Sequence, residues 1–192
     1  MEWLTTYIKY NQCQIRRAKG NRWTRRVKDG FELEDYIVYF DGKIMWVAPP
    51  GYLWDGSSYP SAKTPLGKML REMVGNRKKY GLLAASAHHD QMRIKSKELF
   101  MYYCDKTEVE EWKQAIADDR FGEFIEDKPM KNVYLTVREA ASLYWEMIVR
   151  WPNSDETVSF IKAFRQYLGL TAFQPWYRLI VPTNTAWEKV EV

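Results

Sequence analysis

The sequence has few of the residues that most often build metal or disulfide sites. It contains only two cysteines, Cys13 and Cys104, and two histidines, His88 and His89, in 192 residues. No Cys-x-x-Cys or paired Cys/His spacing occurs, so the sequence offers no structural zinc motif. The two cysteines lie far apart along the chain, which favours reduced thiols over a disulfide scaffold.

Long apolar runs are also missing. No stretch approaches the roughly 18 apolar residues that predict a membrane-spanning helix. The first residues lack the apolar core and cleavage site of a secretion signal. We therefore expect a protein without a transmembrane segment that is made and folds in a cytoplasm.

Aromatic residues and local positive charge are abundant. Aromatics make up 16% of the chain, with nine Trp and thirteen Tyr, and such residues serve interfaces as well as cores. Residues 1–30 carry a net charge of +6, whereas the remainder sums to −2. This basic segment indicates either a phosphate-binding surface for nucleic acid or lipid headgroups, or a solvated strand face. The arginines that would contact nucleic acid are Arg16, Arg17, Arg22, Arg25 and Arg26.

The first quarter of the chain predicts an antiparallel sheet. Residues 2–10 alternate loosely between apolar and polar side chains, and residues 22–28 form a second candidate strand. Residues 36–40 and 44–48 are rich in β-branched and aromatic residues and flank Asp41-Gly42. An Asp-Gly pair between two such runs is a strong hairpin signal, because it suits the positive φ angles of a tight turn.

The chain after Pro60 reads mostly as helix. Two capping boxes, Thr107-x-x-Glu110 and Thr136-x-x-Glu139, predict helix starts. The expected helices span residues 65–74, 79–94, 96–104, 107–117, 136–151, and one from Ser154 or Asp155 to Gly169. Residues 118–131 are expected to form a loop, and the β-like residues 176–181 to return to the sheet. Strands followed by helices indicate a single α+β domain over 1–192, with a helical bundle packed on the N-terminal sheet.

One candidate site combines a loop and a helix. Residues 49–60 (PPGYLWDGSSYP) place Asp55 in a Gly/Pro/Ser-rich loop, and residues 80–93 (YGLLAASAHHDQMR) place His89 and Asp90 on an Ala-rich helix. An imidazole beside carboxylates can activate water, and carboxylate oxygens can hold a divalent cation such as calcium. We predict His89 and Glu98 as catalytic residues and Asp55 and Asp90 as ligands of a divalent cation, calcium or zinc. Further residues predicted to line the site are Trp54, Ser57, Ser58, His88 and Arg93.

A structural interpretation of the same residues stays open. A histidine on an Ala-rich helix is frequently a packed, hydrogen-bonded core residue, and an Asp before Gly often caps a turn. His88 is the weaker of the two histidines as a catalytic candidate.

The two segments also resemble a family of tailed-phage and prophage proteins, a domain of unknown function. Residues 49–60 resemble its P-x-G-F-x-T-D-G-A-S-x-P signature, and residues 84–93 with 95–100 resemble its Ala-rich helix ending H-D-x-x-Y and its acidic-x-x-Phe element. The likeness covers about residues 35–151, leaving the basic segment 1–30 and the tail 152–192 outside it. Trp54, Arg93 and Glu98 stand where the family usually has Thr, Tyr and Asp. The His-Asp pair is also similar to the helix of secreted calcium-dependent phospholipases of the A type, which implies that His89 activates water, Asp90 and the loop of Asp55 bind the ion, and Glu98 orients the imidazole.

Three functional hypotheses follow, from the candidate site with its resemblances, from the abundant aromatic residues and from the basic segment. The first is a phage-encoded, metal-dependent hydrolase of the host envelope, acting on lipid ester or peptidoglycan. The second is a non-catalytic virion component of the tail or neck that contacts other virion proteins. The third is a nucleic-acid-binding accessory protein. Synthesis in the host cytoplasm, with possible incorporation in the virion, is expected for each.

Overall fold

The fold was analysed in a computed structural model. It describes residues 1–5, 8–17, 27–56, 65, 80–93, 100–103, 106–128, 135–152, 164, 167–168, 171 and 187–191. Strands in the N-terminal part precede most of the helices, so the predicted α+β class is confirmed. Within these residues, no helix is both long enough and apolar enough to cross a bilayer.

The first sheet contains the predicted hairpin. Its four strands run in the order β1 (Glu2–Trp3), β4 (Ile37–Phe40), β5 (Ile44–Ala48) and β7 (Phe100–Tyr103), all antiparallel. Gly42 at the hairpin turn has a φ of 102°, and the Asp41 carboxylate accepts hydrogen bonds from the backbone N–H groups of Lys43 and Ile44. The Asp-Gly signal therefore predicted this turn correctly.

The second sheet joins distant parts of the chain. Its strands run in the order β6 (Leu53–Trp54), β3 (Lys28–Leu33), β2 (Tyr10–Arg17) and β8 (Trp187–Lys189). The N-terminal strands thus form two sheets, and each sheet takes one strand from later in the sequence. A C-terminal return to the N-terminal strands was expected, and residues 187–189 make it. The segment 176–181, where it was predicted, lies outside the described residues.

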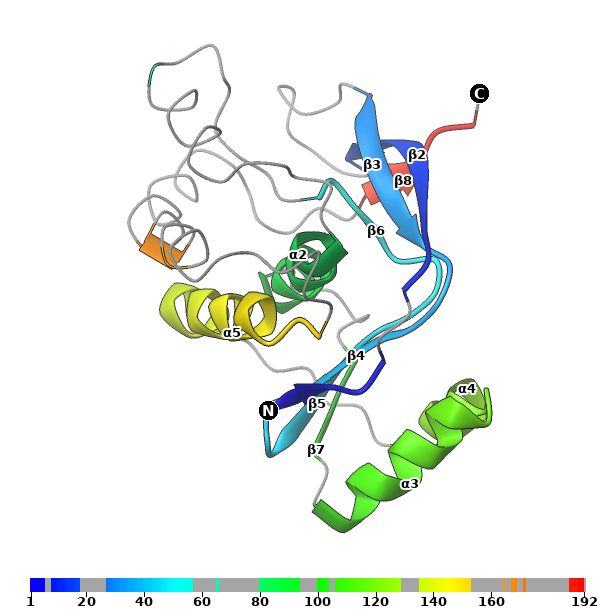
Figure 1. Ribbon diagram of the computed structural model, residues 1–192. Coiled ribbons are helices and arrows are strands. Elements are labelled where there is room, and N and C mark those ends of the chain that lie inside the picture. Colours follow the sequence, from blue (N-terminus) through cyan, green and yellow to red (C-terminus); the bar gives the residue numbers. More distant parts are fainter. Residues whose placement is uncertain are drawn as a thin grey trace.

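Among the residues that the structure describes, four helices flank the first sheet. They are α2 (Tyr80–Arg93), α3 (Lys106–Ala117), α4 (Phe121–Glu126) and α5 (Val137–Val149). Figure 1 shows α2 and α5 side by side on one face of the sheet, with α3 and α4 on the other face. The helices are therefore layers on two faces of a sheet, and a single helical bundle is not evident. The predicted capping box of α5 is present, with Thr136 and Glu139 each bonding the other's backbone N–H.

Two hydrophobic cores explain why the central strands are apolar on both faces. In β4, Ile37 and Tyr39 belong to the core beneath α2 and α5, while Val38 and Phe40 belong to the core beneath α3 and α4. Successive side chains of a strand point to opposite faces, so a strand covered on both faces lacks the usual polar alternation. Trp3 extends the first core by donating its indole N–H to the Met147 carbonyl at 2.9 Å.

Two predictions in the helical region were wrong. Residues 100–103 form strand β7, although residues 96–104 were predicted as helix. Their Phe, Met and Tyr side chains suit either state, and pairing with β5 decides for the strand. Residues 121–126 form α4, although residues 118–131 were predicted as loop; burial of Phe121 and Ile125 against Trp112 stabilises this short helix. Of the predicted helix 65–74 only Pro65 is described, and of the C-terminal helix only Phe164, Tyr167 and Leu168.

Candidate functional site

The β6 strand brings the Asp55 loop to the second sheet. The N–H of Gly51 donates to the Leu33 carbonyl at 2.7 Å, and the N–H of Leu33 donates to the Tyr52 carbonyl at 3.1 Å. Gly51 has a φ of 78°, a backbone angle that favours glycine, so the Pro-Pro-Gly sequence turns the chain sharply after β5. Asp55 follows at the end of β6.

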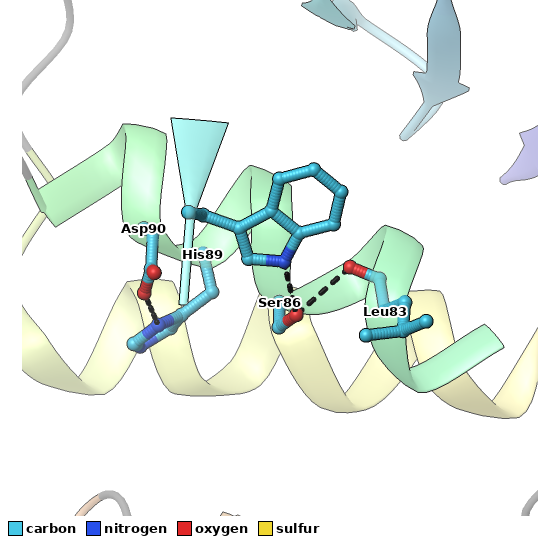
Figure 2. Close-up of polar contacts among 5 residues, drawn as sticks. Leu83, Ser86, His89 and Asp90 are labelled. Carbon is cyan, nitrogen blue, oxygen red and sulfur yellow. Dashed lines mark hydrogen bonds and ion pairs between the residues drawn. The ribbon is translucent and has the colours of Figure 1, made fainter. Parts of the chain in front are cut away.

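Trp54 fastens this loop to α2. Its side chain is fully buried, and its ring contacts Tyr10, Phe31 and Tyr52. Its indole N–H donates to Ser86 Oγ at 3.0 Å, and that hydroxyl donates to the Leu83 carbonyl at 2.8 Å (Figure 2). The small side chains around Ser86 on α2 allow the indole to approach the helix.

Asp55 is held by a lysine. Its carboxylate forms an ion pair with Lys28 Nζ, and only 8% of the Asp55 side chain is exposed. The same ammonium group lies 4.4 Å from the centre of the Trp187 ring, a cation–π contact. Lys28 begins β3, Trp187 begins β8 and Asp55 follows β6. Three strands of the second sheet therefore contribute to the surroundings of the Lys28 ammonium.

His89 and Asp90 form the second half of the site. His89 Nδ1 lies 3.5 Å from Asp90 Oδ1. Figure 2 marks this contact with a dashed line. The imidazole is nearly buried and packs edge-on against the Tyr144 ring of α5, with ring centres 5.3 Å apart. Asp90 is the more open of the two, with 26% of its side chain exposed. The Asp90 carboxylate is therefore mostly enclosed by protein but keeps some contact with solvent.

The electrostatics of Asp90 link the two halves. Burial is the main cause that raises the pKa of the Asp90 carboxyl above its ordinary value, and the nearby Asp55 carboxylate raises it further. The His89 hydrogen bond and the Lys28 ammonium act in the opposite direction. The His89–Asp90 contact and the Asp55 carboxylate therefore lie within electrostatic reach of one another, and their grouping as one site stays a prediction.

His88 points elsewhere. It is 1% exposed and lies in the first core, with its ring centre 5.7 Å from that of Trp3. Burial lowers the pKa of His88 to about 3, so its imidazole is neutral at physiological pH. The location of His88 matches the structural interpretation of this histidine.

Several predicted residues cannot be placed in the site. Glu98, Ser57 and Ser58 lie outside the described residues, and the side chain of Arg93 does too. In the basic segment, Arg16 pairs with Glu188 at 3.3 Å. The side chain of Arg17 and the whole of Arg22, Arg25 and Arg26 lie outside the described residues, so the nucleic-acid surface stays a prediction.

Sequence reasoning missed three neighbours of the site, namely Lys28, Tyr144 and Trp187. Lys28 was counted only as part of the basic segment, and its distance of 27 residues from Asp55 gives no local signal. The strand order β6-β3-β2-β8 brings Lys28 to Asp55 and Trp187 to Lys28. Tyr144 lies in the predicted helix 136–151, but its contact with His89 depends on how that helix packs against α2.

The predicted metal does not fit the described side chains. Among the residues that the structure describes, no three His, Cys, Asp or Glu side chains are grouped so as to hold a metal ion. The cation beside Asp55 is instead the Lys28 ammonium. The chemistry that the described residues support is general acid–base catalysis by His89, oriented by Asp90.

Comparisons with protein-family models, curated proteins and solved structures gave no match to this chain. The likeness to the phage family therefore rests on the two sequence segments alone.

Proposed function

We propose that this chain is a phage-encoded hydrolase of the host cell envelope that uses His89 as its general base. The observation that carries the proposal is the contact of His89 Nδ1 with Asp90 Oδ1 at 3.5 Å, on a helix that is separate in the sequence from the Asp55 loop. The Asp55 carboxylate, which acts on the charge of Asp90, supports it. These two segments are also the ones that resemble the phage family. A lipid ester or a peptidoglycan bond is the proposed substrate.

The proposed reaction is addition of water to an acyl carbon. The imidazole of His89 removes a proton from water as the water oxygen bonds to the carbonyl carbon. The resulting imidazolium then returns the proton to the leaving oxygen or nitrogen as the acyl bond breaks. Asp90 accepts a hydrogen bond from Nδ1, which fixes the ring orientation and stabilises the imidazolium. No step in this scheme requires a metal ion.

The surroundings of His89 support this role. Tyr144 packs against the edge of the imidazole, so the ring has little freedom to rotate. Because Nδ1 faces Asp90, the nitrogen that takes the proton is Nε2, on the other side of the ring. The side chains of His89 and Asp55 are nearly buried, so little bulk water surrounds them. The low exposure strengthens the electrostatic interactions within the site.

The test is a hydrolysis assay with phospholipid vesicles and with purified peptidoglycan fragments. Wild-type protein is expected to release fatty acid from vesicles or soluble fragments from peptidoglycan. His89→Gln is expected to reduce that rate by about 10²–10⁴-fold, the usual contribution of a general base. The matched control is His88→Gln, which removes the neighbouring imidazole from the core without touching the site. Each variant is assayed well below its own unfolding temperature.

Two outcomes contradict the proposal. One is an inactive wild type with both substrates. The other is a folded His89→Gln variant as active as His88→Gln.

A further inference from the structure

Two exposed apolar side chains lie close together in the C-terminal part of the chain. Phe164 and Leu168 both have helical backbone, and their exposed fractions are 44% and 47%. Residues four apart in a helix lie on the same face, so these two side chains form one apolar surface. The other exposed large apolar side chains among the described residues, Met1 and Val27, are far from this pair in the sequence.

This apolar surface is joined to α5 through aromatic rings. The Tyr167 ring stacks on that of Phe164, with centres 6.3 Å apart, and its centre lies 6.2 Å from that of the Trp145 ring of α5. Figure 1 shows part of this helix in orange, beside α5. Trp145 directly follows Tyr144, whose ring packs against His89. Ring contacts and one helix therefore connect the exposed surface to the proposed catalytic imidazole.

The sequence around this surface carries positive charge and no negative charge. Residues 157–187 contain no Asp or Glu. Their charged side chains are Lys162, Arg165 and Arg178, and the segment is also rich in Phe, Tyr and Trp. Exposed Phe and Leu on a helix in a cationic segment are typical of proteins that bind the surface of an anionic bilayer.

A lipid bilayer suits this surface better than nucleic acid or a second copy of the chain. Nucleic acid would attract the positive charge but offers no apolar phase to the Leu168 side chain. A symmetric contact with a second copy would bring two cationic segments together, which repel each other. An anionic bilayer supplies both negative headgroups and an apolar interior.

We propose that the surface of Phe164 and Leu168 binds the interface of an anionic lipid bilayer. Both side chains enter the boundary between headgroups and acyl chains, and the positive charge of residues 157–187 attracts the headgroup phosphates. Binding brings α5 close to lipid, so the inference selects lipid from the two substrate classes proposed for His89. That selection rests on the proposed function, whereas the binding itself does not.

The experiment is cosedimentation of the full chain with vesicles of ether-linked lipids. Such lipids contain no acyl ester, so binding is measured without hydrolysis. One set of vesicles contains equal parts of phosphatidylglycerol and phosphatidylcholine, and the other contains phosphatidylcholine alone. The test variant is Phe164→Gln with Leu168→Gln, which removes the apolar surface and keeps good helix formers. The matched control is Val27→Gln, because Val27 has the same exposed fraction as Leu168, 47%.

Wild type is expected to bind the phosphatidylglycerol vesicles at least about tenfold more tightly than those of phosphatidylcholine alone. The double variant is expected to bind the phosphatidylglycerol vesicles about tenfold more weakly than wild type. Val27→Gln should bind like wild type. Three results would overturn the proposal: no binding of wild type, equal binding of wild type to both kinds of vesicle, or a double variant that binds as tightly as Val27→Gln.

Leu168→Trp provides a second measurement if the double variant does not fold. Tryptophan favours the interface of a bilayer, so this variant is expected to bind more tightly than wild type. Equal or weaker binding would count against the proposal. Sedimentation velocity without lipid tests the alternative occupant. A wild-type dimer that the Leu168→Gln substitution dissociates would assign the surface to contact between copies and overturn the proposal.

The outcome is separate from that of the hydrolysis assay. A chain that binds ether-lipid vesicles but hydrolyses neither phospholipid nor peptidoglycan would support lipid binding and refute the proposed function. Hydrolysis of either substrate by a chain that does not bind these vesicles would support the proposed function and refute lipid binding.

Discussion

The indole N–H of Trp54 donates a hydrogen bond to Ser86 Oγ at 3.0 Å, and this contact joins β6 to α2. Asp55 follows Trp54, and His89 lies one helical turn after Ser86. The distance between the loop half and the helix half of the site is therefore set by one buried hydrogen bond and the aromatic cluster around it.

Trp54→Phe tests this connection. The substitution keeps an aromatic ring in the core but removes the donor and part of the buried volume. We expect a loss of about 2 kcal/mol in the free energy of unfolding, from the hydrogen bond and the small cavity together. Urea unfolding measures the loss. Ser86→Ala provides the other half of a double-variant cycle, and strictly additive effects would contradict the coupling.

Gly30→Ala tests the close packing between β2, β3 and β6. An added Cβ would lie 2.1 Å from Ile15 Cδ1 and 2.8 Å from the Trp54 carbonyl oxygen. Backbone at that distance cannot move aside without displacing β6, so we expect destabilisation of about 1–3 kcal/mol or more. Thermal unfolding measures it. Gly122→Ala, where the nearest atom is the Tyr36 hydroxyl at 3.4 Å, is the control and should leave stability nearly unchanged. A Gly30→Ala protein as stable as that control would refute the packing argument.

His88 predicts acid sensitivity of the fold. Burial lowers its pKa from 6.5 to about 3 in the folded protein. Below pH 6.5 the unfolded chain binds a proton that the folded protein does not, so stability falls as the pH drops from about 6.5 towards 3. Each unit of pKa difference corresponds to about 1.4 kcal/mol. The free energy of unfolding, measured with urea between pH 4.5 and 7.5, should depend less steeply on pH for His88→Leu than for wild type. An equal pH dependence of the two proteins would exclude His88 as the cause.

Asp90 offers a titration that reports on its neighbours. Lys28 lowers the pKa of the Asp90 carboxyl and Asp55 raises it. Lys28→Met should therefore move the titration midpoint of Asp90 to higher pH, and Asp55→Asn should move it to lower pH. The ¹³C shift of the Asp90 carboxyl carbon follows both. Lys189→Met serves as the charge-matched control, and shifts of the same sign in both site variants would contradict the assigned geometry.

Local patterns in the sequence predicted the elements that depend on local chemistry. The Asp41-Gly42 turn, the Ala-rich helix α2 and the Thr136 capping box each carry their signal within a few residues. The strand β7 and the helix α4 carry no such signal. Backbone pairing with β5 stabilises β7, and burial of Phe121 and Ile125 stabilises α4. The residues of these two segments alone cannot decide between helix, strand and loop.

The same division holds for the site. Asp55, His89 and Asp90 were found because they stand in two recognisable segments. Lys28 and Trp187 were not, because the contact of Lys28 with Asp55 and that of Trp187 with Lys28 depend on which strands pair across the second sheet. The ion pair of Lys28 with Asp55 can be predicted only when the order of the strands is known.

The pairing of β8 with β2 has a consequence for the order of folding. Ile15 faces Lys189 across these strands, so the second sheet is complete only after residue 189 has left the ribosome. The β4–β5 hairpin needs only neighbouring residues and can form during synthesis. Trp187 lies in β8, so the Lys28 ammonium gains its aromatic contact only when β8 pairs with β2. In a nascent chain that lacks residues 187–189, the Lys28 ammonium has not yet gained its contact with the Trp187 ring.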